Sequence, residues 1–164
     1  MSESRLRVAI GALALAGLAI ASYLTYARYS GTQLYCATGG CETVQHSRYA
    51  TLAGVPIAVL GLVGYAAVLG TATRRGPLAA AVGVAVAAAG MVFSAYLLAA
   101  QLFLIHAVCQ WCVASDVVVS LLAIAAWARF ACAQRDLSLP RVAESPQPRR
   151  RRLPQQGSAP ARMP

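Results

Sequence analysis

The chain has 164 residues, of which 59% are hydrophobic and 12% are charged, and its formal net charge is +9. Because about 25% of the residues in an ordinary soluble domain are charged, this composition excludes a soluble globular protein and indicates an integral membrane protein. The positive charge comes entirely from arginine and is explained by membrane topology, so it does not indicate nucleic-acid binding.

Four apolar stretches are long enough to cross a membrane, running from Val8 to Tyr29, Val55 to Thr73, Leu78 to Leu104 and Val108 to Ala131. A helical span needs about 20 residues to cross about 30 Å of hydrocarbon. The stretches lack the alternation of a β-barrel strand, so each is predicted to be an α-helix that satisfies its own backbone groups in lipid. The predicted fold is all-α: an integral membrane four-helix bundle, one domain over residues 1–133.

The start of the first stretch also has the outline of a secretory signal. Arg5 and Arg7 precede it, and Ala19-Ile20-Ala21 before Ser22 resembles a cleavage site. The apolar character continues past this point through Leu24, however, which gives a full span. We therefore expect a retained helix.

Arginine sets the expected orientation. It is concentrated before span one, between spans two and three, and after span four, at Arg5, Arg7, Arg74, Arg75, Arg135, Arg141 and Arg149 to Arg152. The positive-inside rule makes these segments cytoplasmic. We expect a multi-pass protein of the cell inner (cytoplasmic) membrane with both termini in the cytoplasm. The loop from about Ser30 to Gly54 and the connection around His106 then lie on the extracytoplasmic side, where disulfides persist.

Residues 134–164 form an arginine- and proline-rich tail. Its Pro, Gln, Ser and Ala content cannot bury a core, so it is predicted to be a disordered cytoplasmic segment. Contact with anionic membrane lipid is the alternative for its arginine run.

One cysteine pair lies in the predicted extracytoplasmic loop between spans one and two. Cys36 and Cys41 enclose a flexible turn in which Gly39 and Gly40 tolerate left-handed backbone angles. The pair is either a permanent disulfide that staples the loop or a mobile pair that exchanges electrons with other thiols. The presence of a second pair favours exchange.

The second pair, Cys109 and Cys112, begins span four. Residues three apart share one helix face, so the two can form a disulfide with Cys109 nearer the water and Cys112 one turn deeper. The positive end of the helix dipole favours a thiolate at this position, which makes such a pair reactive.

The face that carries Cys109 and Cys112 continues through Asp116 and Ser120, four residues apart, in a span otherwise filled with apolar side chains. Because an intramembrane carboxyl group is costly, it usually marks a pocket or a pathway. Asp116 is predicted to line a pocket inside the bundle, and a purely structural role is the alternative.

Zinc binding by the four paired cysteines is another possibility, because four thiolates suit tetrahedral zinc. An oxidising compartment and the burial of one ligand in a membrane span argue against it. No metal site is therefore expected. Cys132, near the other end of span four, is expected to act as a small apolar side chain.

With these residues in view, the chain resembles the bacterial form of the vitamin K epoxide reductase family. The resemblance covers the four spans and excludes the tail. It rests on the loop cysteines, on Ser47-Arg48-Tyr49-Ala50 after Cys41, on Leu52-Ala53-Gly54-Val55-Pro56 leading into Gly61-Leu62-Val63-Gly64-Tyr65, and on Ile105-His106-Ala107-Val108-Cys109-Gln110-Trp111-Cys112.

The resemblance implies roles for particular residues. Cys36 would receive electrons from a protein partner, Cys41 would attack Cys109, and Cys112 would lie against a quinone. Ser47 matches a Ser or Thr near the family's active site. Animal members commonly carry a Tyr one turn beyond the second cysteine of the C-x-x-C motif, and this chain departs from that pattern with Asp116.

The implied activity is quinone-dependent thiol-disulfide oxidoreduction. Such a protein re-oxidises an extracytoplasmic thioredoxin-like (DsbA-like) partner and passes two electrons to a membrane quinone, menaquinone or ubiquinone, in support of disulfide formation. We expect no fused thioredoxin-like domain and therefore a separate partner protein. Reduction of a vitamin K epoxide stays open. The alternative class is a non-enzymatic membrane scaffold with static disulfides or a metal-binding cysteine cluster.

Overall fold

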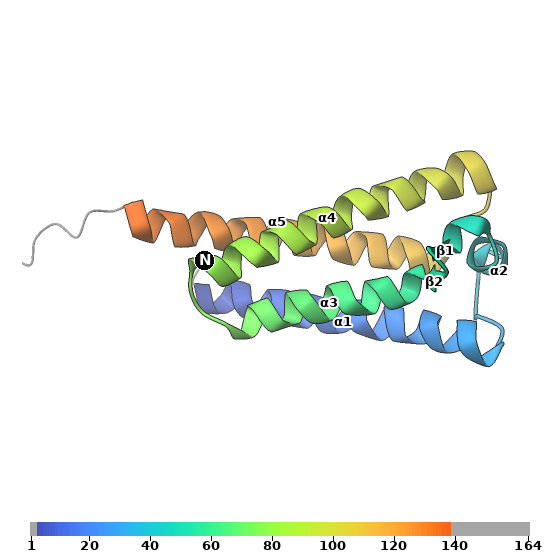
Figure 1. Ribbon diagram of the computed structural model, residues 1–164, viewed down its shortest axis with the longest axis horizontal. Helices are drawn as coiled ribbons and strands as arrows, with labels where there is room; N and C mark the ends of the chain where they lie inside the picture. Colours follow the sequence, from blue (N-terminus) through green and yellow to red (C-terminus); the bar gives the residue numbers. More distant parts are fainter. Residues whose placement is uncertain (1–2, 139–164) are drawn as a thin grey trace, which may run out of the picture.

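The computed structural model describes residues 3–138, and its long helices lie side by side along one axis (Figure 1). They are α1 (Glu3–Ser30), α3 (Ile57–Thr73), α4 (Pro77–Ala100) and α5 (Gln110–Ser138). Helix α1 packs on α3 and α5, and α4 packs on α3 and α5. The predicted all-α four-helix bundle is confirmed.

Three of these helical segments are long and apolar enough to span a membrane: Glu3–Ser30, Pro77–Ile105 and Gln110–Arg135. Helix α3 is shorter, with 17 residues and a length of about 25 Å. The predicted second span began at Val55, but Val55 and Pro56 form a strand that precedes the helix. The four helices otherwise occupy the four predicted stretches, in a membrane protein.

Helix α5 extends beyond its predicted end at Ala131 and continues to Ser138. The first residues of the predicted tail, 134–138, are therefore helical. The rest of that tail lies outside the described residues.

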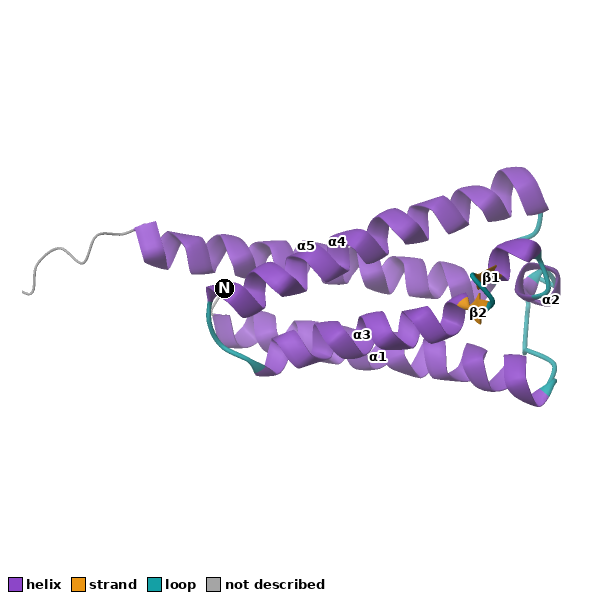
Figure 2. Ribbon diagram, viewed as in Figure 1, coloured by secondary structure: helices purple, strands orange, loops and turns teal. Residues whose placement is uncertain are grey.

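The small elements gather at one end of the bundle (Figure 2). They are α2 (Cys41–Gln45), the 3-10 turn η1 (Arg48–Ala50), and strands β1 (Thr51–Leu52) and β2 (Val55–Pro56). The strands pair antiparallel through a two-residue turn in which Ala53 and Gly54 both have positive φ, as this tight hairpin type requires. Helix α4 continues through a π-helical turn, η2 (Gln101–Ile105), toward the same end.

Small side chains let the helices approach closely. A Cβ at Gly17 of α1 would lie 2.3 Å from the ring of Tyr65 on α3, so only glycine allows this ring to pack there. Tyr65 belongs to the bundle's central cluster together with Ile10, Ala14, Ala21, Val68, Ala72 and Leu122. Such close packing is the main force between helices in lipid, where burial of apolar surface gives no net gain.

Two arginines close the C-terminal end of α3. Arg129 of α5 donates from Nη1 to the Thr71 carbonyl at 2.9 Å and from Nη2 to the Arg74 carbonyl at 2.6 Å. Arg7 of α1 donates to the carbonyls of Ala72 at 2.8 Å and Thr73 at 2.8 Å. The last carbonyls of a helix have no partner within it, so these guanidinium groups satisfy them and tie α3 to both neighbours. Nothing in the sequence singles out Arg129 for this contact.

Candidate functional site

The loop after α1 lies against the connection between α4 and α5. The Tyr35 carbonyl accepts hydrogen bonds from the Trp111 indole at 2.8 Å and the Gln110 amide at 3.2 Å. Thr38 Oγ1 donates to the Val108 carbonyl at 2.9 Å. These bonds join segments about 70 residues apart in the chain. They hold the first cysteine pair over the second.

Close approach of the two segments depends on Gly40. A Cβ at this position would lie 2.6 Å from the Val108 carbonyl oxygen and 2.8 Å from its nitrogen. Both are backbone atoms, which cannot swing away as a flexible side chain would. The absence of a side chain at Gly40 therefore sets how near Cys41 comes to the segment that carries Cys109.

The four predicted cysteines meet at this end of the bundle. Cys36 and Cys41 form a disulfide, while Cys109 and Cys112 are free thiols. Cys41 and Cys109 are fully buried in one apolar cluster, and half-buried Cys36 and Cys112 pack against it. The buried sulfurs of Cys41 and Cys109 thus share one cluster with the partly exposed Cys36 and Cys112. Cys132 is a free thiol elsewhere on α5.

Cys109 lies just before the first turn of α5, outside the spanning segment Gln110–Arg135. A hydrogen bond with the Cys112 thiol lowers the pKa of the Cys109 thiol to about 7, helped by the backbone N–H groups of Cys112 and Trp111 and opposed by burial. Because the thiolate is the nucleophile in disulfide exchange, Cys109 is suited to react near neutral pH.

We predict that Cys112→Ala shifts the ionisation of Cys109 to higher pH, toward the ordinary thiol value of about 8.5. The variant loses the largest contact that favours the thiolate, so less thiolate is present at pH 7. Ultraviolet thiolate absorbance, recorded against pH with Cys132 replaced by Ala and the outer disulfide intact, measures the midpoint. Ser120→Ala serves as a control on the same helix. An unchanged midpoint in Cys112→Ala would show that another group sets the Cys109 pKa.

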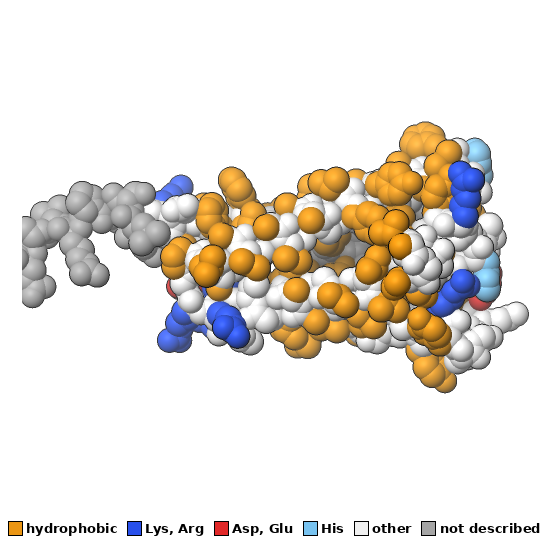
Figure 3. Space-filling view, in the orientation of Figure 1, with side chains coloured by type: hydrophobic (Ala, Val, Ile, Leu, Met, Phe, Trp, Pro, Cys, Tyr) orange, Lys and Arg blue, Asp and Glu red, His pale blue; other side chains and the backbone are white. Residues whose placement is uncertain are grey.

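A cavity of about 220 Å³ lies between the helices directly below the cysteines. Its walls are mostly apolar, and a hollow is visible between the rows of hydrophobic side chains on α3 and α4 (Figure 3). The polar or reactive side chains on its wall are Cys112, Asp116, Ser115, Ser94, Tyr65, Gln101, Ser47, Tyr49 and Gln45. Cys112 is thus the one cysteine of the four that borders the cavity.

Asp116 is on the cavity wall, as the helix phase from Cys112 predicts. Its Oδ1 accepts a hydrogen bond from Ser94 of α4. Its Oδ2 is buried and has no hydrogen-bond partner among the described residues. A buried oxygen without a partner is costly, so this atom is suited to a group that enters the cavity.

Of the two remaining residues singled out from the sequence, Ser47 borders the cavity and Ser120 does not. The Ser47 hydroxyl donates to the Val44 carbonyl at 2.8 Å. Ser120 donates to the Asp116 carbonyl at 2.8 Å within its own helix. The polar stripe on α5 therefore contributes Cys112 and Asp116 to the cavity.

Six polar residues of the cavity wall were given no role from the sequence: Gln45, Tyr49, Tyr65, Ser94, Gln101 and Ser115. Tyr65 donates to the Ser115 carbonyl at 3.1 Å and its hydroxyl lies 2.7 Å from Ser115 Oγ, while Ser94 binds Asp116. Tyr65 is the last residue of the motif Gly61-Leu62-Val63-Gly64-Tyr65, which by itself predicts no role for its hydroxyl. Ser94 is one of few polar residues in span three, and that rarity was the available signal.

The state of the cysteines argues against the zinc site considered above. The disulfide between Cys36 and Cys41 occupies two of the four sulfurs that a zinc site would need. Within residues 3–138, no group of three or more His, Cys, Asp or Glu side chains is arranged to hold a metal ion.

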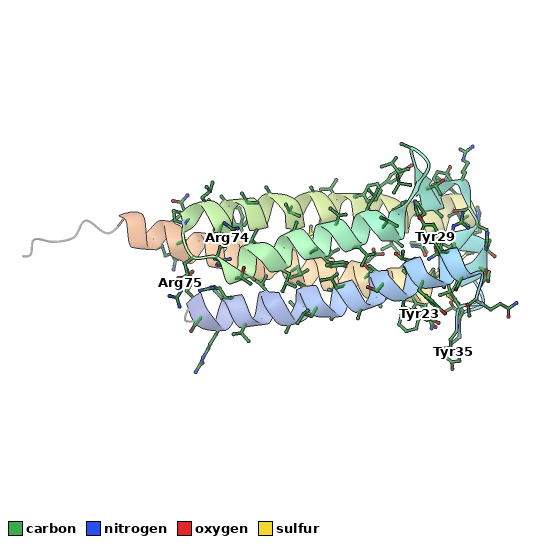
Figure 4. All side chains as sticks on the ribbon, turned by 60° about the horizontal axis from the view of Figure 1, so that its bottom comes forward. Tyr23, Tyr29, Tyr35, Arg74 and Arg75 are labelled. Carbon is green, nitrogen blue, oxygen red and sulfur yellow. A yellow bond between two sulfur atoms is a disulfide. The ribbon has the colours of Figure 1, made fainter. Side chains whose placement is uncertain are left out.

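Arginine side chains lie at both ends of the bundle (Figure 3), and Arg28 and Arg48 contact His46 and Tyr49 at the cysteine end. Tyr23, Tyr29 and Tyr35 lie at the cysteine end, and Arg74 and Arg75 lie at the other (Figure 4). Tyrosine is enriched at membrane interfaces and arginine on the cytoplasmic side.

Comparisons with known proteins agree with this arrangement. Residues 8–127 match the model of the vitamin K epoxide reductase family. A 57-residue stretch is 39% identical to the thiol-disulfide oxidoreductase LTO1 of Arabidopsis thaliana, which corresponds to 34% of this chain and 15% of that relative. Since the family match covers most of the four long helices, both cysteine pairs and the residues that line the cavity, this chain belongs to the vitamin K epoxide reductase family.

Proposed function

We propose that the protein is a quinone-dependent thiol-disulfide oxidoreductase that re-oxidises an extracytoplasmic thioredoxin-like protein and thereby supports disulfide formation. The observation that carries this proposal is the series of four sulfurs from half-buried Cys36 to the cavity wall at Cys112. A relative named as a thiol-disulfide oxidoreductase and the family match support the same class of reaction.

In the proposed first stage, a thiolate of the reduced partner attacks Cys36 and opens the Cys36–Cys41 disulfide. The partner's second thiol resolves this mixed disulfide, so the partner leaves oxidised and the outer pair is reduced. Cys41 then attacks Cys109 of an inner disulfide, and Cys36 resolves that intermediate. The inner pair is now the dithiol seen in the structure, and the outer pair is again a disulfide.

The cavity fits a quinone as the electron acceptor. An apolar cavity of about 150 Å³ holds benzene, so a cavity of about 220 Å³ has room for a substituted ring. The hollow between α3 and α4 would let an isoprenoid tail extend into lipid (Figure 3). Asp116 Oδ2 can hydrogen-bond a ring oxygen. A bound quinone accepts two electrons and two protons, which Cys109 and Cys112 supply as they form their disulfide.

Energetics also favour a respiratory quinone such as menaquinone or ubiquinone. A DsbA-like partner has a reduction potential near about −120 mV, and each 30 mV corresponds to about 1.4 kcal/mol for two electrons. The final acceptor must therefore be more oxidising still, or respiration must keep it oxidised. A lipid-soluble quinone meets this requirement inside the bundle.

We predict that Asp116→Ala slows quinone reduction while exchange among the four cysteines continues. The variant removes the carboxyl group one turn below Cys112 that would hydrogen-bond the ring or relay a proton. Asp116→Asn keeps the size and the hydrogen bonding but removes the titratable proton, so it separates a proton relay from simple contact. Stopped-flow measurement of quinone reduction gives both rates. Unchanged rates and quinone affinity in both variants would assign Asp116 to helix packing.

We also propose that both termini are cytoplasmic and that the cysteine end faces outward across the cytoplasmic membrane. Arg74 and Arg75 at the end opposite the cysteines, and Tyr23, Tyr29 and Tyr35 at the cysteine end, support this orientation (Figure 4). Reporter fusions after Gly40, Arg75, Ala107 and Ser138 are expected to alternate outside, inside, outside and inside. An active extracytoplasmic reporter after Ser138 would reverse the assignment.

The direct test of the proposed function mixes purified protein, a reduced thioredoxin-like protein and a quinone analogue. Quinone reduction that depends on the four cysteines is the expected result. A membrane scaffold with static disulfides would show none, and its cysteines would stay oxidised or reduced regardless of the added partner.

A further inference from the structure

Gln101 is a buried polar residue that takes no part in the proposed electron transfer. It begins the π-helical turn η2 and is only 2% exposed. Its backbone carbonyl accepts from the N–H groups of His106 and Ala107, the latter at 3.2 Å. His106 then takes a left-handed conformation with φ 55°, which ends the helix. Isolated π-helical turns occur frequently at functional sites.

The side chain of Gln101 reaches further along the same connection. Its Oε1 accepts a hydrogen bond from the backbone N–H of Cys109 at 2.9 Å. Cys109 is fully buried, so this N–H requires a partner. Gln101 therefore holds His106, Ala107 and Cys109, three of the four residues between η2 and α5.

The bond to Cys109 also determines which way the carboxamide faces. An N–H donor requires the amide oxygen, so the amide nitrogen must lie on the other side of the group. Gln101 borders the cavity, and no hydrogen bond from its Nε2 to another described residue is found. Within residues 3–138, the amide nitrogen of Gln101 thus has no protein acceptor, and Asp116 Oδ2, a buried atom of another residue on the cavity wall, lacks a hydrogen-bond partner as well.

Cys109 itself does not border the cavity, whereas Gln101 contacts both. We propose that Gln101 couples the cavity to Cys109: its amide nitrogen donates to a ring carbonyl of the bound quinone while its amide oxygen holds the Cys109 backbone. Occupation of the cavity then restrains the segment that carries the reactive thiol. This inference rests on the proposed function, and it makes Gln101 a ligand contact and a positioning residue.

The test follows the Cys109 amide by NMR in full-length protein with isotopically labelled cysteine amides, with and without a heptyl-substituted quinolone as a redox-inert quinone mimic. In wild type, the quinolone is expected to shift the Cys109 amide signal and to slow its hydrogen exchange. Gln101→Met keeps the approximate shape but removes donor and acceptor. We expect about tenfold faster exchange at Cys109, about fivefold weaker quinolone binding, and no further effect of quinolone on that amide.

Two further variants make the test specific. Leu102→Met changes the residue next to Gln101 on η2, at an exposed position that does not border the cavity, and should behave like wild type. Gln101→Glu keeps an oxygen for the Cys109 N–H but loses the amide donor, so protection of Cys109 should persist while quinolone affinity falls. If Gln101→Met does not fold, the Gln101→Glu variant tests the proposed coupling by itself.

The outcomes separate this inference from the proposed function. If wild type reduces quinone and both Gln101 variants bind quinolone as wild type does, with the same response at Cys109, the coupling is overturned and the function stands. If wild type neither reduces quinone nor binds the quinolone, the proposed function fails, and the coupling fails with it.

Discussion

Alanine in place of any one of Cys36, Cys41, Cys109 or Cys112 is expected to abolish oxidation of the thioredoxin-like partner, whereas Cys132→Ala should leave turnover intact. Each of the four sulfurs carries one bond of the proposed relay, and no other side chain can form that bond. Cys132 lies about 20 residues from Cys112 on the same helix, a distance of about 30 Å, so it cannot exchange with the relay. Partner oxidation followed by thiol trapping and gel mobility measures the effect.

The individual variants also report the order of the relay. Cys112→Ala cannot form the inner disulfide, so Cys109 cannot accept electrons from the outer pair, and Cys36 and Cys41 are expected to accumulate as thiols once the partner has reduced them. Cys41→Ala leaves Cys36 as a lone thiol, which is expected to form a mixed disulfide with added oxidised partner, because the partner's own disulfide is the bond that breaks. If Cys132→Ala proves as inactive as Cys112→Ala, the proposed sequence of exchanges is wrong.

Gly40→Ala is expected to slow electron transfer from the outer to the inner cysteine pair by about a hundredfold, because a displacement of about 1 Å at a reacting centre can have that effect. The added Cβ would lie 2.6 Å from the Val108 carbonyl oxygen. The loop must therefore lift, which also weakens the bond between Thr38 and Val108. Rapid-mixing measurement of inner-pair reduction by the reduced partner tests this result.

Two controls accompany Gly40→Ala. Gly39 has φ 71° and no atom within 4 Å of an added Cβ, and asparagine tolerates this left-handed conformation. Gly39→Asn should therefore transfer electrons at close to the wild-type rate. Gly40→Ala with a chemically reduced inner pair should still reduce quinone, since the cavity is unaltered. Normal transfer between the pairs in Gly40→Ala would show that the contact with Val108 does not set their approach.

Several features of this protein follow from the sequence by itself. The apolar stretches predict the helices because hydropathy is a local property of about 20 residues. The helix phase from Cys112 correctly places Asp116 on the same wall, because residues four apart share a face in any α-helix. The helix ends are less well predicted: α3 starts after a short strand, and α5 runs on to Ser138.

The tertiary structure alone decides which distant groups meet. Ser94 reaches Asp116, Gln101 holds Cys109 and Arg129 closes the end of α3, and each pair lies on different elements. No local pattern predicts such pairs, because they depend on the rotation and axial register of helices packed through small residues. Gly40 is a further example. The sequence shows that a glycine stands there, but only the structure shows that any side chain at this position would collide with the Val108 backbone.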